Sequence, residues 1–524
     1  MSSSRAPLGG IARAAALITF GNLLSRLLGL FRESVIAGLF GTSVVTSAFT
    51  TAATVPTMLY DLIIGGAVSA ALIPVFAQYA AREDPKAASD LGRAVGSVTA
   101  IVFAVLTAGS ALLVVFAPFL VRILGVAPAD SAYELTVALV RIVLPSVVLL
   151  GVSSVLTALL YSRQRFVFPA FAIALYNLGI VAGALALAPR IGPFGLAVGV
   201  LIGAGLQLAL QAVGLRQTRL RLSIDFRHPA VHRVLRLYAP VALGLVVTQL
   251  GVILERNLAW RTGEDSLAVM RFAGTLIQLP LGLIAAAVSF AILPRLASAA
   301  ENEAGLESYK SMLSLGLRFI LLGIIPASAM LVALREPVVR LLFERQAFDA
   351  AATQATADAF LFYSPQLPFA AVDQLLIFAF YARRNTVTPM LVGVVGIGIY
   401  VTAGLLLIGP LAMGVRGLAL ANAIQNSLHA VILGYLLWRA VGPGAGAGVF
   451  RTVRHTALAS VAPTALCLAA LDPLADAHGI ALVAALGAIF AAAGLMFVAG
   501  LVVMRSEEAR EVWGLVRARI GRKG

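Results

Sequence analysis

The stretch Asn22–Gly41, NLLSRLLGLFRESVIAGLFG, decides the fold class of this chain. It is apolar and long enough to enter a bilayer, yet it contains two serines, two arginines and a glutamate. A charged side chain at the bilayer centre costs at least about 2.5–3.5 kcal/mol and usually faces a protein interior or a water-filled cavity. At helical spacing the polar residues fall on two adjacent stripes, formed by Ser25, Arg26, Arg32 and Glu33. We therefore expect a membrane-spanning helix with one polar side.

The composition is that of an integral membrane protein. Of the 524 residues 60% are hydrophobic and 12% are charged, and the mean hydropathy is +0.96. These values lie far from those of a soluble globular domain. The apolar runs are about 20 residues long and lack the strict alternation of membrane β-strands, so we expect helices. Windows of high hydropathy predict an all-α polytopic membrane protein with about 14 transmembrane helices.

The basic residues indicate the topology of the chain. The net charge of +15 and the pI near 10.7 would favour nucleic-acid binding in a soluble protein. Here most of the 39 lysines and arginines fall on the side of the N-terminus when the predicted loops are assigned to alternate sides of the membrane. The positive-inside rule then places both termini in the cytoplasm. We expect no nucleic-acid partner.

An internal repeat divides the chain. Ala67–Pro74 reads AVSAALIP and Ala287–Pro294 reads AVSFAILP, with five of eight positions identical. The separation spans an even number of predicted helices, so the copies should have the same orientation, as in transporters with parallel repeats. The predicted parts are an N-terminal lobe of about six helices at 1–220, a C-terminal lobe of about six helices at 221–440, two extra helices at 441–504 and a basic cytoplasmic tail at 505–524.

The tail, Arg505–Gly524, leaves two interpretations open. Trp513, Val516 and Ile520 share one helical face, with basic residues elsewhere. This pattern is typical of a segment that lies on anionic lipid. A solvated basic tail that follows the positive-inside bias fits the same residues.

Several kinds of chemistry are not indicated. No G-x-x-x-x-G-K-[ST] motif occurs, so we do not expect an ATP-driven pump. His228 and His232 have the spacing of a helical metal site but lack H-E-x-x-H, and the single cysteine, Cys467, lies in an apolar span. The acidic residues lie mostly in loops and are not clustered for acid–base catalysis. The sequence therefore predicts a protein that is not an enzyme and that binds no metal or cofactor.

Charged side chains within the predicted spans are the strongest functional candidates. They are Arg26, Arg32, Glu33, Asp61, Arg141, Glu255, Arg256, Arg271 and Asp373. Arginine predominates, and guanidinium groups suit phosphate through bidentate hydrogen bonds, so an anionic, phosphate-bearing cargo is indicated. The alternative is internal pairing, for example Arg26 with Glu33 or Arg32 with Asp61, which would lock helices together.

Several blocks resemble a known family, the MurJ/MviN lipid II flippases of the multidrug/oligosaccharidyl-lipid/polysaccharide exporter superfamily. The blocks occur in order over nearly the whole chain: SRLLGLFRE at 25–33, AGLFG at 37–41, the segment from Pro56 to Pro74 followed by VFAQY, YSRQRFVFPAFAIALYN at 161–177, LLFERQAFDAAATQ at 341–354 and FYARRNTVTP at 380–389. The resemblance also covers two helices beyond a twelve-helix core.

The resemblance implies a two-lobed flippase of the bacterial cell membrane. Such a protein moves an undecaprenyl-pyrophosphate-linked peptidoglycan precursor from the inner to the outer leaflet by alternating access. Its expected partners are lipid II or a related lipid, membrane lipids and cell-wall synthesis proteins. Arg26 and Arg32 match the cavity arginines that the family assigns to the pyrophosphate. The expected substrate-binding set is Arg26, Arg32, Arg141 and Arg271.

The chain departs from the family pattern at several cavity positions. Ser47 stands where an aspartate is common, Tyr60 where an arginine is expected, Gly65–Gly66 in place of a Glu-Gly pair, and Thr275 in place of another arginine. Arg271 lies one helical turn before Thr275 and takes its place if the helix turns it inward. The expected supporting polar residues are Ser25, Glu33, Ser47, Tyr60, Asp61, Glu255 and Arg256.

These departures keep two alternatives open beside a lipid II flippase. One is an exporter of another lipid-linked saccharide or of a drug within the same superfamily. The other is a non-transporting scaffold for cell-wall enzymes, which the missing cavity residues motivate. The eleventh predicted span has no carboxylate, so a sodium site of the kind suggested for some family members is not supported.

Overall fold

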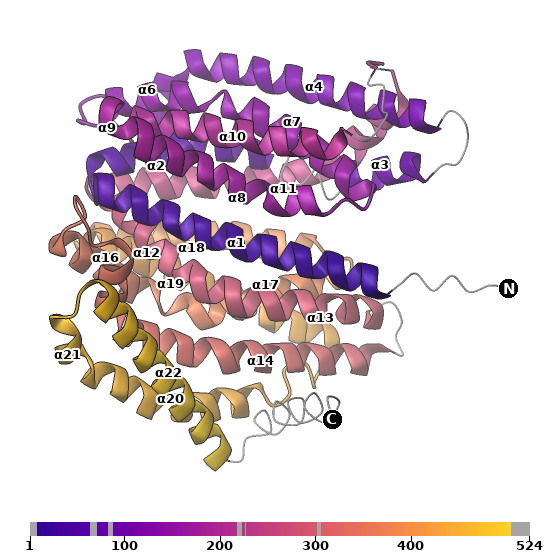
Figure 1. Ribbon diagram of the computed structural model, residues 1–524. Coiled ribbons are helices and arrows are strands. Elements are labelled where there is room, and N and C mark those ends of the chain that lie inside the picture. Colours follow the sequence, from indigo (N-terminus) through magenta and orange to yellow (C-terminus); the bar gives the residue numbers. More distant parts are fainter. Residues whose placement is uncertain are drawn as a thin grey trace. The chain divides into compact units, whose positions relative to one another are not determined.

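The computed structural model describes residues 8–62, 71–81, 87–216, 223–225, 227–300 and 305–504 (Figure 1). Within these ranges the regular structure is helical, and no strand occurs apart from an isolated bridge between Arg345 and Phe348. The predicted all-α fold class is confirmed. Gly65–Gly66 and the tail Arg505–Gly524 lie outside the described residues.

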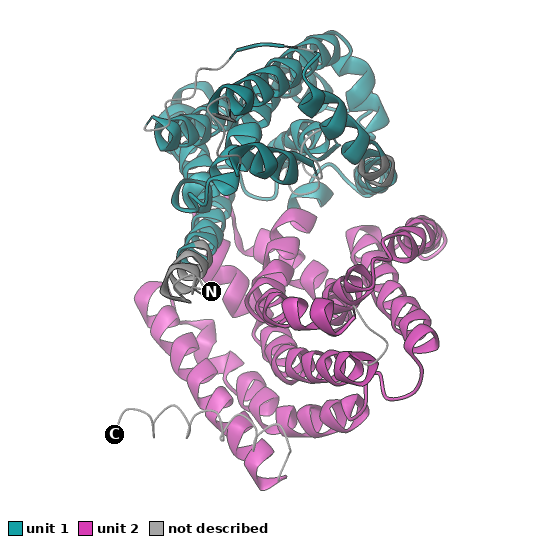
Figure 2. Cartoon of the chain, turned by 90° about the vertical axis from the view of Figure 1, so that its right-hand side faces the viewer, with its two compact units in different colours: residues 1–268 teal, residues 269–524 magenta. Residues whose placement is uncertain are grey.

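The chain forms two compact units, Met1–Ala268 and Val269–Gly524, coloured separately in Figure 2. The first contains α1 (Leu8–Phe40), α2 (Val44–Tyr60), α3 (Ile73–Ala80), α4 (Ala87–Val115), α5 (Ala117–Ile123), α6 (Tyr133–Val143), α7 (Ser146–Ser162), α8 (Val167–Ala182), the π-helical turn η3 (Gly183–Leu187), α9 (Ala188–Ile191), α10 (Phe194–Leu215) and α11 (Pro229–Trp260). Helix α12 (Ser266–Pro280) begins at its end. The second continues with η4 (Leu281–Ala285), α13 (Ala286–Ala299), α14 (Leu306–Ala333), α15 (Arg335–Phe343), α16 (Ala350–Tyr363), α17 (Gln366–Ala382), α18 (Val387–Ile408), α19 (Gly414–Val441), α20 (Val449–Ala469), α21 (Leu471–Ala475) and α22 (Gly479–Val503).

Many of these helices suit a membrane. In the described ranges eight stretches are long and apolar enough to cross one: Ala88–Val115, Tyr133–Ser162, Val167–Ile191, Phe194–Leu215, Ser266–Ala299, Leu306–Ala333, Val387–Ile408 and Gly479–Val503. Helices α1, α11 and α19, with 33, 32 and 28 residues, are also long enough to cross, but polar side chains interrupt their apolar windows. The figure of about 14 spans stays a prediction.

The two units share a helix break at a proline. In the first unit α6 ends and α7 begins around Pro145, and in the second α16 ends and α17 begins around Pro365, 220 positions later. Proline has a fixed φ and no N–H group, so it suits the start of a helix and disfavours continuation of the preceding one. The break therefore recurs at the spacing of the sequence repeat.

The turn that follows each of these helices also recurs. Gln164 after α7 and Arg384 after α17 have positive φ angles of 58° and 59°. In each turn the next residue, Arg165 or Asn385, donates its N–H to a carbonyl five positions earlier, at 2.9 and 3.0 Å. This common order of elements agrees with the repeat that the sequence predicts. By compactness, however, the division falls after Ala268 and groups α11 with the first unit, so the lobe boundaries at 220 and 440 stay a prediction.

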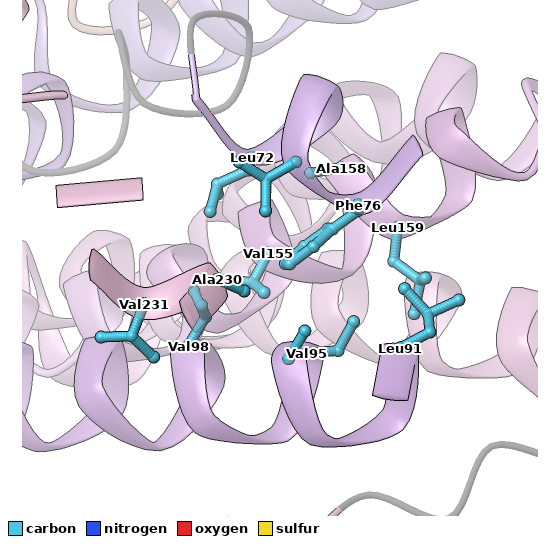
Figure 3. Close-up of a cluster of buried hydrophobic side chains, with 12 residues drawn as sticks. Leu72, Phe76, Leu91, Val95, Val98, Val155, Ala158, Leu159, Ala230 and Val231 are labelled. Carbon is cyan, nitrogen blue, oxygen red and sulfur yellow. The ribbon is translucent and has the colours of Figure 1, made fainter. Parts of the chain in front are cut away.

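Helix α11 is fixed to the first unit near both of its ends. Near its start, Ala230 and Val231 pack into a buried apolar cluster around Phe76 (Figure 3). The cluster also contains Leu72, Val75, Leu91, Ala94, Val95, Val98, Val155, Ala158 and Leu159. At its last residue, the indole Nε1 of Trp260 donates to Oγ1 of Thr51 on α2 at 3.0 Å. These contacts explain why α11 belongs to the first unit by compactness.

Close backbone packing positions α8 beside α1 and α10. A Cβ atom added to Gly179 on α8 would lie 2.3 Å from Cα of Gly203 on α10, so only glycine permits this approach. On the other side of α8, a Cβ atom at Gly21 of α1 would lie 2.4 Å from the carbonyl oxygen of Ala170. Helix α8 is therefore held at a fixed position along α1, which decides what its side chain Asn177 can reach.

Candidate functional site

The first span carries an arginine that is held by two neighbours. Nη2 and Nε of Arg32 lie 2.5 and 3.1 Å from Oε1 of Glu33. Nη1 of Arg32 donates to Oδ1 of Asn177 on α8 at 2.8 Å. The side chain of Arg32 is 24% exposed and that of Glu33 is 6% exposed. Since charge-assisted bonds in a region of low dielectric constant are strong, they orient the Arg32 guanidinium group.

Asn177 joins this pair to the preceding turns of α1. Its Nδ2 donates to the carbonyl oxygen of Ser25 at 3.1 Å, and the Ser25 hydroxyl donates to the carbonyl oxygen of Gly21 at 2.8 Å. Asn177 is buried, and both ends of its amide are used. We call Ser25, Arg32, Glu33 and Asn177 the α1–α8 cluster. It ties α8 to the polar side of α1.

Sequence reasoning quoted Asn177 within a family block but did not place it among the site residues. An amide in an apolar span was the available signal, because such groups commonly bond across membrane helices. The pairings named as examples, Arg26 with Glu33 and Arg32 with Asp61, do not occur among the described residues. Glu33 pairs with Arg32 instead.

Arg26 is arranged differently from Arg32. Its residue is exposed, as is Leu23 one turn earlier, and within the described ranges it has no ion pair or hydrogen bond with another residue. A guanidinium group carries five N–H donors and keeps its charge at any physiological pH. Arg26 therefore has its full bonding capacity available for an anion, whereas Arg32 has part of it committed.

Ser47 and Tyr60 stand where the family commonly has an aspartate and an arginine. Both take part in helix packing. Ser47 is fully buried, and its hydroxyl accepts a hydrogen bond from the N–H of Ala268 at 3.2 Å. The phenol oxygen of Tyr60 lies 2.8 Å from the hydroxyl of Ser154 on α7. Asp61, next along the chain, bonds through its backbone N–H to Thr57 and Met58, and its side chain has no hydrogen bond to a described residue. In this conformation α2 thus uses neutral hydroxyl groups to hold its neighbours.

The remaining predicted residues lie on other helices. Arg141 is exposed on α6, and its Nε donates to the carbonyl oxygen of Val114 at 3.3 Å, near the end of α4, where a cation is favourable. Glu255 and Arg256 are half-buried on α11, and Nε of Arg256 has no hydrogen-bond partner among the described residues. Arg271 is half-buried on α12 in the second unit.

Arg271 and Thr275 are linked along their own helix. The hydroxyl of Thr275 donates to the backbone oxygen of Arg271 at 3.0 Å, as expected for residues one turn apart. Arg271 thus lies one helical turn from Thr275, the position where the family commonly has an arginine. This spacing is compatible with the proposal that Arg271 substitutes for that arginine. It stays a prediction.

No candidate metal centre stands out in the part of the chain that the structure describes. Within it no group of three or more His, Cys, Asp and Glu side chains could hold a metal ion. Cys467 is a free, buried thiol. The chemistry that the α1–α8 cluster and Arg26 offer is electrostatic: one oriented and one uncommitted guanidinium group on the same helix, suited to a polyanionic group such as a pyrophosphate.

Comparison with known proteins identifies the family. A family model described as "Lipid II flippase MurJ" matches residues 36–474. A relative of that name from Burkholderia cenocepacia is 30% identical over 432 residues, which cover 80% of this chain and 82% of the relative. A solved structure of a lipid II flippase MurJ in an inward closed conformation aligns with a TM-score of 0.77 and 22% identity over 95% of this chain and 99% of that one.

The wider superfamily shares the fold. An inward-facing multidrug resistance transporter of the MATE family aligns with a TM-score of 0.68 and 14% identity, over 84% of this chain and 99% of that one. The resemblance first seen in SRLLGLFRE and the later blocks is thus confirmed by a match over most of the sequence. The chain belongs to the MurJ family of lipid II flippases.

Proposed function

We propose that this chain moves lipid II from the inner to the outer leaflet of the bacterial cell membrane by alternating access. The family membership supports the cargo, because the matched relatives carry the name lipid II flippase. The observation that carries the proposal is the pair Arg26 and Arg32 on α1, with Arg32 oriented by Glu33 and Asn177. Family members are transporters, so the protein is not expected to be an enzyme.

In this proposal the two arginines have different tasks. Arg26, which is uncommitted, contacts the pyrophosphate directly, and Arg32 contributes its remaining N–H groups from a fixed orientation. The polyprenyl tail stays in lipid, which needs no polar contact. Arg141 and Arg271 are proposed as further cationic contacts. Since moving one charge across the membrane potential is worth about 2.3 kcal/mol per 100 mV, the potential helps to reset the empty carrier.

We propose that both termini are cytoplasmic, as the distribution of basic residues indicates. The turn after α7 would then lie at the inner surface, with Arg163 and Arg165 on it. Burial and the neighbouring Arg165 lower the pKa of the Arg163 guanidinium group. At the inner surface the two arginines would face anionic lipid headgroups, to which basic residues are attracted.

A second candidate cargo is another saccharide linked to undecaprenyl pyrophosphate. The comparisons do not favour it, and its motivation is that Ser47 and Tyr60 stand where the family commonly has charged cavity residues and bond within the protein. The pyrophosphate would be recognised in the same way, while the sugar would meet a less polar surface. Comparing translocation of lipid II with that of other undecaprenyl-pyrophosphate saccharides separates the two candidates.

The test is complementation of bacteria depleted of their own lipid II flippase. We expect the wild-type chain to restore growth and the double variant Arg26→Ala with Arg32→Ala to fail at an equal protein level. Arg190→Ala is the matched control, because Arg190 is an exposed arginine on α9 whose recorded bond is to the carbonyl oxygen of Ala186 in the adjoining turn η3. Growth with the double variant would overturn the assigned role of the arginines.

A further inference from the structure

The second unit contains an ionisable pair that headgroup binding does not use. Nδ1 of His429 on α19 lies 2.7 Å from Oδ1 of Asp373 on α17. The side chains of His429 and Asp373 are 14% and 17% exposed, so the pair is largely shielded but not fully enclosed. Both residues lie near the middle of their helices rather than at the ends. An ionisable residue at such a position in a membrane helix is costly and indicates a function.

The pair belongs to a polar seam between the two helices. Nδ2 of Asn426 donates to Oε1 of Gln366 at 2.5 Å and lies 2.9 Å from Oδ1 of Asn422. Asn422, Asn426 and His429 have the spacing of one helical face, and so do Gln366 and Asp373. We call these five residues the α17–α19 seam. Nδ2 of Asn426 thus joins the other two amides, while the carboxylate and the imidazole bond to each other.

Helix α18 packs against the seam at a glycine. A Cβ atom added to Gly396 would lie 3.6 Å from Nε2 of Gln425 and 3.8 Å from Cδ2 of His429. The imidazole ring therefore has the backbone of α18 near its Cδ2 and the Asp373 carboxylate at its Nδ1. Among the described residues, this carboxylate is the group recorded in contact with a nitrogen of the ring, and it would balance the charge of a protonated imidazole.

Other ionisable groups near the seam have partners elsewhere or make no bond to it. Helices α17 and α19 and the helices that pack on them carry Arg295, Glu307, Tyr309, Lys310, Arg318, Asp358, Tyr363, Tyr381, Tyr400, Arg416, Tyr435 and Arg439. Arg416 pairs with Asp358 at 2.7 Å and Lys310 with Glu307 at 2.8 Å. None of these twelve ionisable residues has a recorded ion pair or hydrogen bond with Asp373 or His429 in the part of the chain that the structure describes.

The charge of the pair depends on one proton. Imidazole ordinarily changes its charge between about pH 5 and 8, whereas an arginine does not. With His429 protonated, the pair is an ion pair without net charge. With His429 neutral, the pair carries the single negative charge of Asp373, which is costly to bury without compensation. Proton occupancy therefore changes how strongly α17 and α19 are held together.

We propose that Asp373 and His429 form a proton-binding site of the second unit. His429 takes one proton from water and holds it against the Asp373 carboxylate, and release returns that proton to water and leaves a neutral imidazole. The ligand is thus a proton that enters from the aqueous phase. Coupling of this proton to lipid movement rests on the proposed function, whereas its binding does not.

Direct titration tests the binding. The full-length protein, with labelled histidine, is placed in lipid nanodiscs and followed by NMR from about pH 5 to 9. We expect the His429 signal, identified by its loss in His429→Gln, to change from the charged to the neutral form within this range. Asp373→Asn should alter the pH range of that change, and His455→Gln, a half-buried histidine on α20, should not. A His429 signal that stays in one form, or that ignores Asp373→Asn, would overturn the proposal.

Transport tests the coupling. In proteoliposomes we expect the wild-type rate of lipid II movement to change at least about fivefold over about three pH units, since one proton governs the active form. His429→Gln and Asp373→Asn should flatten this dependence, and the exchanged pair Asp373→His with His429→Asp should restore part of it. Restoration also shows that the flattened variants fold. A wild-type pH profile in His429→Gln would refute the coupling.

The two proposals fail in different ways. If the proposed function is wrong, no lipid II moves at any pH, yet His429 still titrates and still responds to Asp373→Asn. If the proton site is wrong, lipid II moves and the arginine variants stop it, but His429→Gln keeps the wild-type pH profile. Arg26→Ala should slow movement at every pH and leave the titration of His429 unchanged.

Discussion

The α1–α8 cluster of the first unit and the α17–α19 seam of the second both place a basic side chain beside a carboxylate, but the two basic groups differ in their chemistry. Each holds a basic side chain between two helices with a carboxylate and nearby amides. In the first the cation is Arg32, which is permanently charged, and in the second it is His429, whose charge can change. The difference teaches that the first region suits a standing anion site and the second a site that gains and loses a proton.

Lysine at the two arginine positions should separate the committed from the uncommitted group. Arg32→Lys loses the fork that bonds both Glu33 and Asn177, so we expect lipid II transport to fall by about 10–100-fold, equivalent to about 1.4–3 kcal/mol. Arg26→Lys keeps the charge and breaks no bond within the protein, so its loss should be smaller. The measurement is the rate in proteoliposomes. Equal losses for both variants would contradict the distinction between them.

Removal of the cross-helix amide should weaken the α1–α8 cluster without removing its charge. Asn177→Leu deprives Arg32 of one acceptor and Ser25 of one donor, and we expect an approximately tenfold loss of transport, or about 1.4 kcal/mol. Asn177→Gln retains both functions of the amide on a longer side chain and serves as the control. A transport rate in Asn177→Leu equal to that of the wild type would show that Arg32 does not need this partner.

The corresponding change in the α17–α19 seam should act on stability more than on headgroup binding. Asn426→Leu leaves the Gln366 amide oxygen without its donor, which should lower the free energy of unfolding by about 1–3 kcal/mol. Thermal unfolding in detergent measures this, with Asn426→Asp as a variant that keeps the size of the side chain. Transport at saturating lipid II should stay within about threefold of wild type, because Arg26 and Arg32 are untouched. A larger loss of transport than Asn177→Leu shows would reverse the comparison.

The smallest effect is expected for a hydrogen bond between two uncharged groups in the first unit. Thr51→Val removes the acceptor of the Trp260 indole N–H, and we expect a loss of about 1 kcal/mol in unfolding free energy with little effect on transport. Thr51→Ser keeps the hydroxyl and should retain most of the stability. If thermal unfolding of Thr51→Val matched that of wild type, the bond between α2 and α11 would not contribute measurably.

The sequence predicted the parts of the fold that depend on local patterns. The apolar period of Asn22–Gly41 predicted α1, and the offset between AVSAALIP and AVSFAILP predicted two related halves, with which the breaks at Pro145 and Pro365 agree. The grouping of α11 with the first unit could not be predicted, because it depends on contacts such as Trp260 with Thr51 between residues far apart in the chain.

The candidate site was predictable only in part for the same reason. The polar stripes on α1 singled out Arg26, Arg32 and Glu33, but only the structure brings Asn177 to Arg32 from another helix. Likewise Asp373 was noted as an intramembrane charge, while its partner His429 becomes visible only when α17 and α19 pack together. Hydropathy singles out individual charged residues in apolar spans. Their partners on other helices can be identified only from the tertiary structure.

The most direct test is the rate at which purified protein in proteoliposomes moves lipid II between leaflets. The account predicts movement by the wild type and by Arg190→Ala, and a loss of at least about 100-fold in the double variant Arg26→Ala with Arg32→Ala, since each charged contact is worth about 1.5–3 kcal/mol. Movement by the double variant at the wild-type rate would contradict the claim that these two arginines bind the cargo.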